Sequence, residues 1–99
     1  MPEHGSWAQL RNRRMSEPRA REAYEAARLA FELGGTVRHL RERRGWSQAD
    51  LAKASGMTQS AVARFEAGGT VPTLPVLDRL ARALDAELTV QVTPHTGVA

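Results

Sequence analysis

Residues 47–66 read SQADLAKASGMTQSAVARFE, and this stretch decides the fold of the chain. It divides at Gly56 into two short helical segments, each of which begins with a hydroxyl residue. The spacing of Ser47 and Asp50 predicts a capping box, in which each side chain binds the backbone amide of the other residue. Thr58 is expected to cap the second helix. Gly56 supplies the positive φ that a tight turn between the two helices needs.

Two short helices held at a fixed angle form a helix-turn-helix motif, whose second helix enters the major groove of DNA. The second helix is expected over about residues 59–67. Its face away from the core carries Gln59, Ser60 and Arg64. Glutamine pairs with adenine and arginine with guanine through two hydrogen bonds each, and serine bonds to several bases. These three residues are therefore the predicted base readers.

A second group of residues is predicted to contact DNA phosphates. The free amides at the start of the first motif helix attract anions, and nearby basic side chains neutralise phosphate charge. The candidates are Ser47, Gln48, Thr58, Lys53, Arg43, Arg44 and the backbone at Gly69.

The segment from Gly45 to Pro72 resembles the Cro/cI-type (Xre-type) helix-turn-helix family of phage repressors and bacterial regulators. The matching elements are GWSQADLA, the turn glycine, TQSAVARFE and the closing AGG, and the resemblance covers about residues 33–85. It implies an all-α, five-helix Cro/cI-type DNA-binding domain. It also implies a structural ion pair between Arg41 and Glu66 that fixes the second motif helix in place.

Composition agrees with a nucleic-acid partner. The 99 residues suit one domain and carry a net charge of +3. Residues 1–64 hold 12 basic and 7 acidic side chains, whereas residues 65–99 hold 2 and 4, so the basic half contains the proposed reading helix. Cysteine is absent, and neither a membrane span nor a signal peptide is evident, so a cytoplasmic protein is expected.

The sequence before the motif predicts an additional helix. Residues 1–15 form a polar, basic arm, and an N-terminal helix is expected over residues 16–35. Gly34, Gly35 and Thr36 are expected to break or bend it, although one long helix running on into the next segment is the alternative. The helix-turn-helix domain is then placed at residues 36–86, and a strand and tail at residues 87–99.

In the C-terminal segment, the spacing of apolar residues changes from that of a helix to that of a strand. Apolar and polar residues alternate over residues 87–93, which predicts a short half-buried β-strand. Because one strand leaves its backbone unpaired, Leu88, Val90 and Val92 are predicted to pair with the same strand of a second copy in a homodimer. Addition to the sheet edge of a partner protein is the alternative.

This layout is similar to HigA-like antitoxins of type II toxin–antitoxin systems, which neutralise a RelE/HigB-like toxin and repress their own operon. The resemblance implies a toxin partner, for which the large apolar candidates are Trp7, Leu10, Tyr24 and Phe31. Packing of the last two on the core is the alternative. Two other functions stay open: a stand-alone Xre-type regulator without a toxin, and a protein-interaction module with a vestigial DNA-binding motif.

Catalysis is not predicted. The three histidines, His4, His39 and His95, lie far apart and lack the spacing of a metal site. No glycine-rich phosphate loop or nucleophile elbow is present. The sequence therefore implies no enzyme, no cofactor and no metal.

Overall fold

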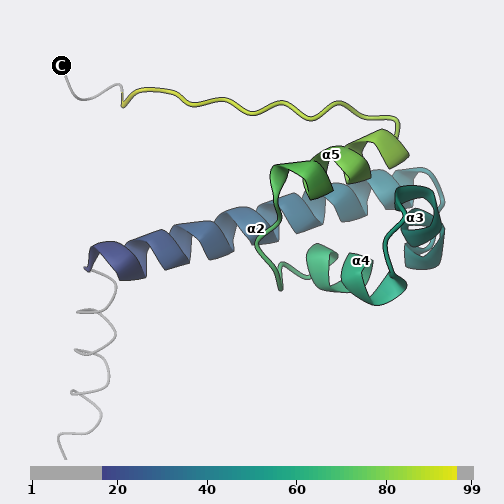
Figure 1. The fold of residues 1–99 in the computed structure, drawn as a ribbon, viewed down its shortest axis with the longest axis horizontal. Coiled ribbons are helices and arrows are strands. Elements are labelled where there is room, and N and C mark those ends of the chain that lie inside the picture. Colours follow the sequence, from purple (N-terminus) through teal and green to yellow (C-terminus); the bar gives the residue numbers. More distant parts are fainter. Residues whose placement is uncertain (1–16, 96–99) are drawn as a thin grey trace, which may run out of the picture.

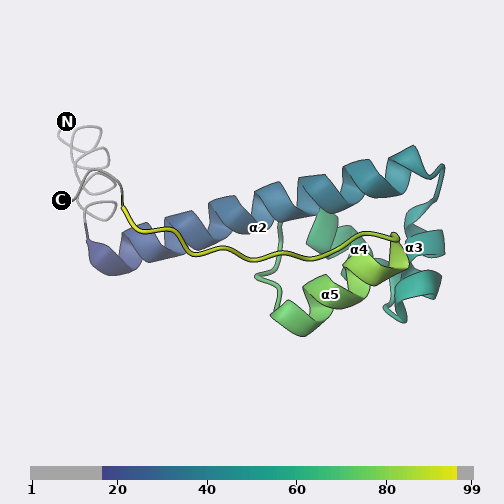
Figure 2. The same cartoon turned by 90° about the horizontal axis from the view of Figure 1, so that it is seen from above.

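The computed structural model describes residues 17–95, which contain four helices and no strand. These are α2 (Pro18–Arg43), α3 (Gln48–Ser55), α4 (Gln59–Glu66) and α5 (Leu74–Ala83). In Figure 1, α2 is a long rod, and the three short helices gather around its C-terminal half. Figure 2 shows the same grouping from above. The segment after α5 is extended and runs toward the N-terminal end of α2.

The short helices begin where their capping residues predict. Ser47 and Asp50 form both hydrogen bonds of the capping box, at 2.8 and 3.0 Å, so this prediction is confirmed. Thr58 accepts the amide of Ala61 at 3.0 Å, and Thr73 accepts that of Val76 at 3.4 Å. Each cap satisfies an amide that has no partner within its helix.

A single apolar cluster joins the four helices. α3 packs against α4 and α5, and α2 packs against α4. Burying one large apolar side chain stabilises a fold by about 1.5–3 kcal/mol. The buried members of the cluster are Val37, Leu51, Ala52, Val62, Phe65, Leu80 and Leu84.

The expected break at Gly34 and Gly35 is absent, because α2 continues through both residues. Gly34 is buried where α2 crosses the end of α4. A Cβ atom on Gly34 would collide with the carbonyl oxygen of Phe65 and lie 2.8 Å from that of Glu66. Gly35 faces open space. Gly34 therefore permits two backbones to approach closely, which is a packing role and not a helix-breaking one.

The predicted five-helix domain with an extra N-terminal helix and a C-terminal strand is wrong. Within residues 17–95 there are four helices, because the extra helix and the first helix of the domain are one element, α2, and a fifth domain helix is absent. The segment expected as a strand has no regular structure. Leu88 is half-buried against α2 and α5, but no backbone among the described residues pairs with this segment.

The first half of α2 extends past the core. Tyr24, Leu29 and Phe31 are exposed on it, and Ala30 is the first buried residue. Its surface is crossed by ion pairs from Arg28 to Glu25 at 2.8 Å and to Glu32 at 2.7 Å. No helix in the described part of the chain has the combination of length and apolarity that crossing a bilayer requires.

Candidate nucleic-acid interface

The surface of α4 presents three exposed polar side chains. Val62, Phe65 and Glu66 are buried on its inner face. Successive residues of an α-helix are about 100° apart, so the opposite face is centred on Ser60 and Arg64. Both are exposed, and Gln59 is exposed in the first turn of α4, about 100° around the helix from Ser60. The structure thus leaves all three predicted base readers accessible and places Ser60 and Arg64 on the face opposite the core.

The N-terminus of α3 carries the next two candidates. Ser47 is exposed, but its amide and its hydroxyl oxygen are both engaged in the capping box with Asp50. Gln48 is half-buried, and its Nε2 donates to Glu66 Oε1 at 3.1 Å. The hydrogen bonds from the backbone and side chain of Ser47 hold the pKa of Asp50 below its usual range. The Asp50 carboxylate therefore stays ionised at this helix end and opposes a phosphate there.

The remaining phosphate candidates are dispersed. Lys53 and Arg43 are exposed on α3 and at the end of α2. Arg44 already has partners, since its guanidinium lies 4.4 Å from the Trp46 ring centre and donates to the Leu84 carbonyl at 3.4 Å. The two other candidates already have partners: the Thr58 hydroxyl accepts the Ala61 amide, and the Gly69 amide donates to the Arg64 carbonyl at 2.9 Å.

A buried ion pair fixes α4 relative to α2. Arg41 Nε lies 2.7 Å from Glu66 Oε2, and Arg41 Nη2 lies 2.9 Å from Oε1. The two side chains are only 10% and 3% exposed. Arg41 also donates to the Trp46 carbonyl at 2.7 Å, and Gln48 completes the coordination of Glu66. One network therefore connects the end of α2, the start of α3 and the end of α4.

The network keeps Glu66 ionised. Burial by itself raises the pKa of this carboxyl group, but the hydrogen bonds from Arg41 and Gln48 and the charge of Arg41 outweigh burial. The pKa of Glu66 is consequently lowered from its ordinary value of 4.5. The hydrogen bonds to Glu66 raise the pKa of Arg41 in turn. Both groups are charged at neutral pH.

We expect the protein to lose stability in acid. A carboxyl whose pKa is lowered by folding binds fewer protons in the native state, so its contribution is full above the unfolded-state pKa. That contribution falls as the pH drops below about 4.5 and through the lower native pKa of Glu66. Urea unfolding measured from neutral pH to about pH 3 checks this. The Glu66→Gln variant should show a flatter profile, and an equally steep one would assign the acid loss to other carboxyls.

Several residues of this region were not identified from the sequence. The Gln48–Glu66 hydrogen bond joins residues 18 positions apart, so no local spacing reveals it. Gly68 has a φ of 77°, and a Cβ there would lie 2.8 Å from the Phe31 Cα. Of the two glycines that follow α4, only Gly69 was predicted to have a binding role, as a phosphate candidate, and Gly68 was interpreted only as part of the helix end. A single glycine is enough to end a helix, so the second glycine was the available sign that two backbones approach closely here.

The other predicted site residues that the structure describes lie away from this surface. Trp7 and Leu10 fall outside the described residues. Tyr24 and Phe31 are 52% and 67% exposed, so their side chains do not pack on the core as the alternative reading required. Val90 and Val92 are exposed in the extended C-terminal segment.

Comparison with known proteins agrees with this geometry. Residues 32–91 match a family model described as a helix-turn-helix domain. The HTH-type transcriptional regulator SutR of Escherichia coli (strain K12) is 32% identical over 66 residues, which cover 67% of this chain and 37% of SutR. The chain thus spans well under half the length of that relative. No solved structure matches the chain.

Proposed function

The chain belongs to the helix-turn-helix domain family, and from this membership we propose that it is a sequence-specific DNA-binding transcriptional regulator. The exposed surface of α4 carries the proposal, because Ser60 and Arg64 lie on its outer face and Gln59 is exposed in its first turn. Arg64 forms no ion pair with any described residue. A free guanidinium on a recognition helix suits the O6 and N7 acceptors of guanine. The proposal assigns a cytoplasmic repressor without a catalytic step or cofactor.

Arg64→Ala tests this role directly. The preferred duplex is first selected from random sequences with the unaltered protein, and both proteins are then titrated against it by fluorescence anisotropy. We expect Arg64→Ala to lose about 1–3 kcal/mol of binding free energy and to relax preference at one G·C base pair. Arg79→Ala is the matched control, since Arg79 is exposed on α5 and its loss changes the net charge equally. Unchanged base preference in Arg64→Ala would remove this residue from the reading surface.

Salt dependence separates DNA binding from a vestigial motif. A protein that neutralises phosphates loses affinity steeply as salt rises, because counterions released on binding must be recaptured. Anisotropy titrations at several salt concentrations give that slope. Absence of binding at low salt to every duplex would favour the protein-interaction module, in which the motif has no DNA partner.

We further propose that the regulator binds a two-fold operator as a homodimer. α4 is 8 residues long and presents three candidate readers, so one copy reads few base pairs. Helix-turn-helix proteins extend their site by placing two copies about 34–36 Å apart on one face of the duplex. A selected duplex with two inverted half-sites at this spacing supports the dimer. A single half-site with one bound copy contradicts it.

The apolar surface on the first half of α2 is the basis for an antitoxin role. Tyr24 and Phe31 are large and more than half exposed, and aromatic side chains are favoured anchors in protein interfaces. We propose that this surface contacts a RelE/HigB-like toxin. A regulator that acts without a toxin is the second candidate, since the reading surface on α4 is complete without α2's first half.

Co-expression with the product of the neighbouring small gene distinguishes these two roles. A complex that co-purifies, relieves growth inhibition and is lost in Tyr24→Ser/Phe31→Ser supports the antitoxin. Leu29→Ser is the matched control, because Leu29 is exposed on another side of the same helix. Specific DNA binding without any complex leaves the stand-alone regulator.

A further inference from the structure

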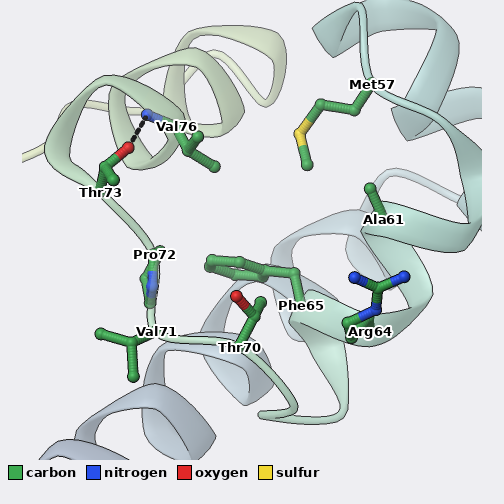
Figure 3. Close-up of a pocket in the computed structure, with 9 residues that line it drawn as sticks. All are labelled: Met57, Ala61, Arg64, Phe65, Thr70, Val71, Pro72, Thr73 and Val76. Carbon is green, nitrogen blue, oxygen red and sulfur yellow. Dashed lines mark hydrogen bonds between the residues drawn. The ribbon is translucent and has the colours of Figure 1, made fainter.

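A small apolar pocket adjoins the reading face of α4. Its volume is about 250 Å³, and it lies between α4, the segment that follows it and the start of α5. The walls include Ala61, Phe65, Met57, Pro72 and Val76. Figure 3 shows Ala61 and Arg64 close together on α4, with the Phe65 ring facing Pro72 across the interior. Arg64 is the charged residue of the lining.

The polar residues that line the pocket are Arg64, Thr70 and Thr73. The Thr73 hydroxyl accepts the Val76 amide, the hydrogen bond drawn in Figure 3. Arg64 has no acidic partner in the described chain, and its aliphatic stem is close to Gly69, where a Cβ atom would lie 3.1 Å from Arg64 Cγ. The pocket therefore suits a group that is apolar and adjoins a hydrogen-bond acceptor for a guanidinium.

Adjacent base pairs of DNA present this combination of groups. In the major groove, thymine carries a C5-methyl group, whereas guanine carries the O6 and N7 acceptors. Neighbouring bases on a strand are about 3.4 Å apart. Ala61 and Arg64 are three positions apart on one helix, so their Cβ atoms lie about 5–6 Å apart. The two side chains can thus face neighbouring base pairs at the same time.

We propose that this pocket receives the C5-methyl group of a thymine next to the guanine contacted by Arg64. This rests on the proposed DNA-reading function and extends it, because it makes Ala61 a specificity-determining residue. A C5-methyl group that enters the pocket is removed from water against Ala61, Phe65 and Val76, whereas a base without the methyl buries less apolar surface there. The site therefore discriminates a methylated pyrimidine from an unmethylated one.

The experiment removes and restores that methyl group alone. In the selected duplex, each thymine is replaced in turn by uracil, which differs only in lacking the methyl. We expect one thymine per half-site, beside the guanine whose preference Arg64→Ala relaxes, to show about a fourfold loss of affinity, the effect of burying one methyl-sized group. Replacing that base pair by 5-methylcytosine·guanine should retain more affinity than unmethylated cytosine·guanine.

Two serine variants test whether the pocket causes the effect. Ala61→Ser places a hydroxyl at the wall and should bring the thymine-to-uracil ratio of affinities close to one. Ala63→Ser is the matched control, since Ala63 is half-buried on the same helix but does not line the pocket, and its ratio should stay near fourfold. Specific binding without a methyl effect, or with an effect that Ala61→Ser leaves intact, overturns the pocket alone. Absence of specific binding overturns the proposed function as well.

Discussion

Gly34→Ala is expected to lower the free energy of unfolding by about 3 kcal/mol, the upper end of the usual cost of overpacking. The added methyl group would meet two backbone carbonyl oxygens at the end of α4, one of them at 2.8 Å. Backbone atoms cannot rotate away as a side chain can, so α2 and α4 must separate. Urea unfolding followed by circular dichroism measures the change. The separation also displaces the reading helix, so DNA affinity should fall in the same variant.

Gly35→Ala is the matched control for this prediction. Gly35 is the next residue of the same helix, is exposed, and has open space around its Cα. Alanine there should raise the free energy of unfolding by about 0.5–1 kcal/mol, because glycine is costly inside a helix. Equal effects of the two substitutions would show that helix propensity governs both sites and that the close approach at Gly34 is unimportant.

These two glycines also show where sequence patterns reach their limit. Each was interpreted as a helix breaker because glycine disfavours helix locally. The choice between a broken and a continuous α2 depends on α4, which is about 30 residues away in the chain and lies against one glycine but not the other. By contrast, the caps at Ser47, Thr58 and Thr73 were predictable, since each joins groups three residues apart.

The C-terminal segment illustrates the same limit for strands. The alternation of apolar and polar residues over 87–93 predicts which side chains lie on the same face of the extended segment. Leu88 does lie half-buried against α2 and α5. The alternation does not predict whether another backbone lies alongside, and the described chain provides none. In the candidate interface, the helical period alone predicts which residues of α4 face away from the core. The Gln48–Glu66 hydrogen bond and the pocket beside Ala61 required the packed structure.

Glu66→Ala is expected to have the largest effect on stability. The substitution removes the carboxylate that binds Arg41 twice, at 2.7 and 2.9 Å, and leaves a guanidinium whose side chain is 10% exposed. Breaking a buried pair in this way costs about 3–5 kcal/mol, because the remaining charge has neither its partner nor full hydration. Gln48 loses its acceptor as well. Urea unfolding at neutral pH gives the magnitude.

Two further variants establish the cause of this loss. Asp78→Ala breaks the ion pair between Asp78 and Arg82, which are joined at 3.0 Å but have 46% and 80% exposed side chains, so it should cost less than about 1 kcal/mol. Arg41→Met/Glu66→Met removes both buried charges, and it should be more stable than Glu66→Ala because no charge is left unpaired. If the double variant is no more stable than the single one, the loss comes from disrupted packing around α4. Recovery of stability would instead assign the loss to the unpaired, buried charge of Arg41. The DNA affinity of the double variant would then show whether the ion pair also orients the reading helix.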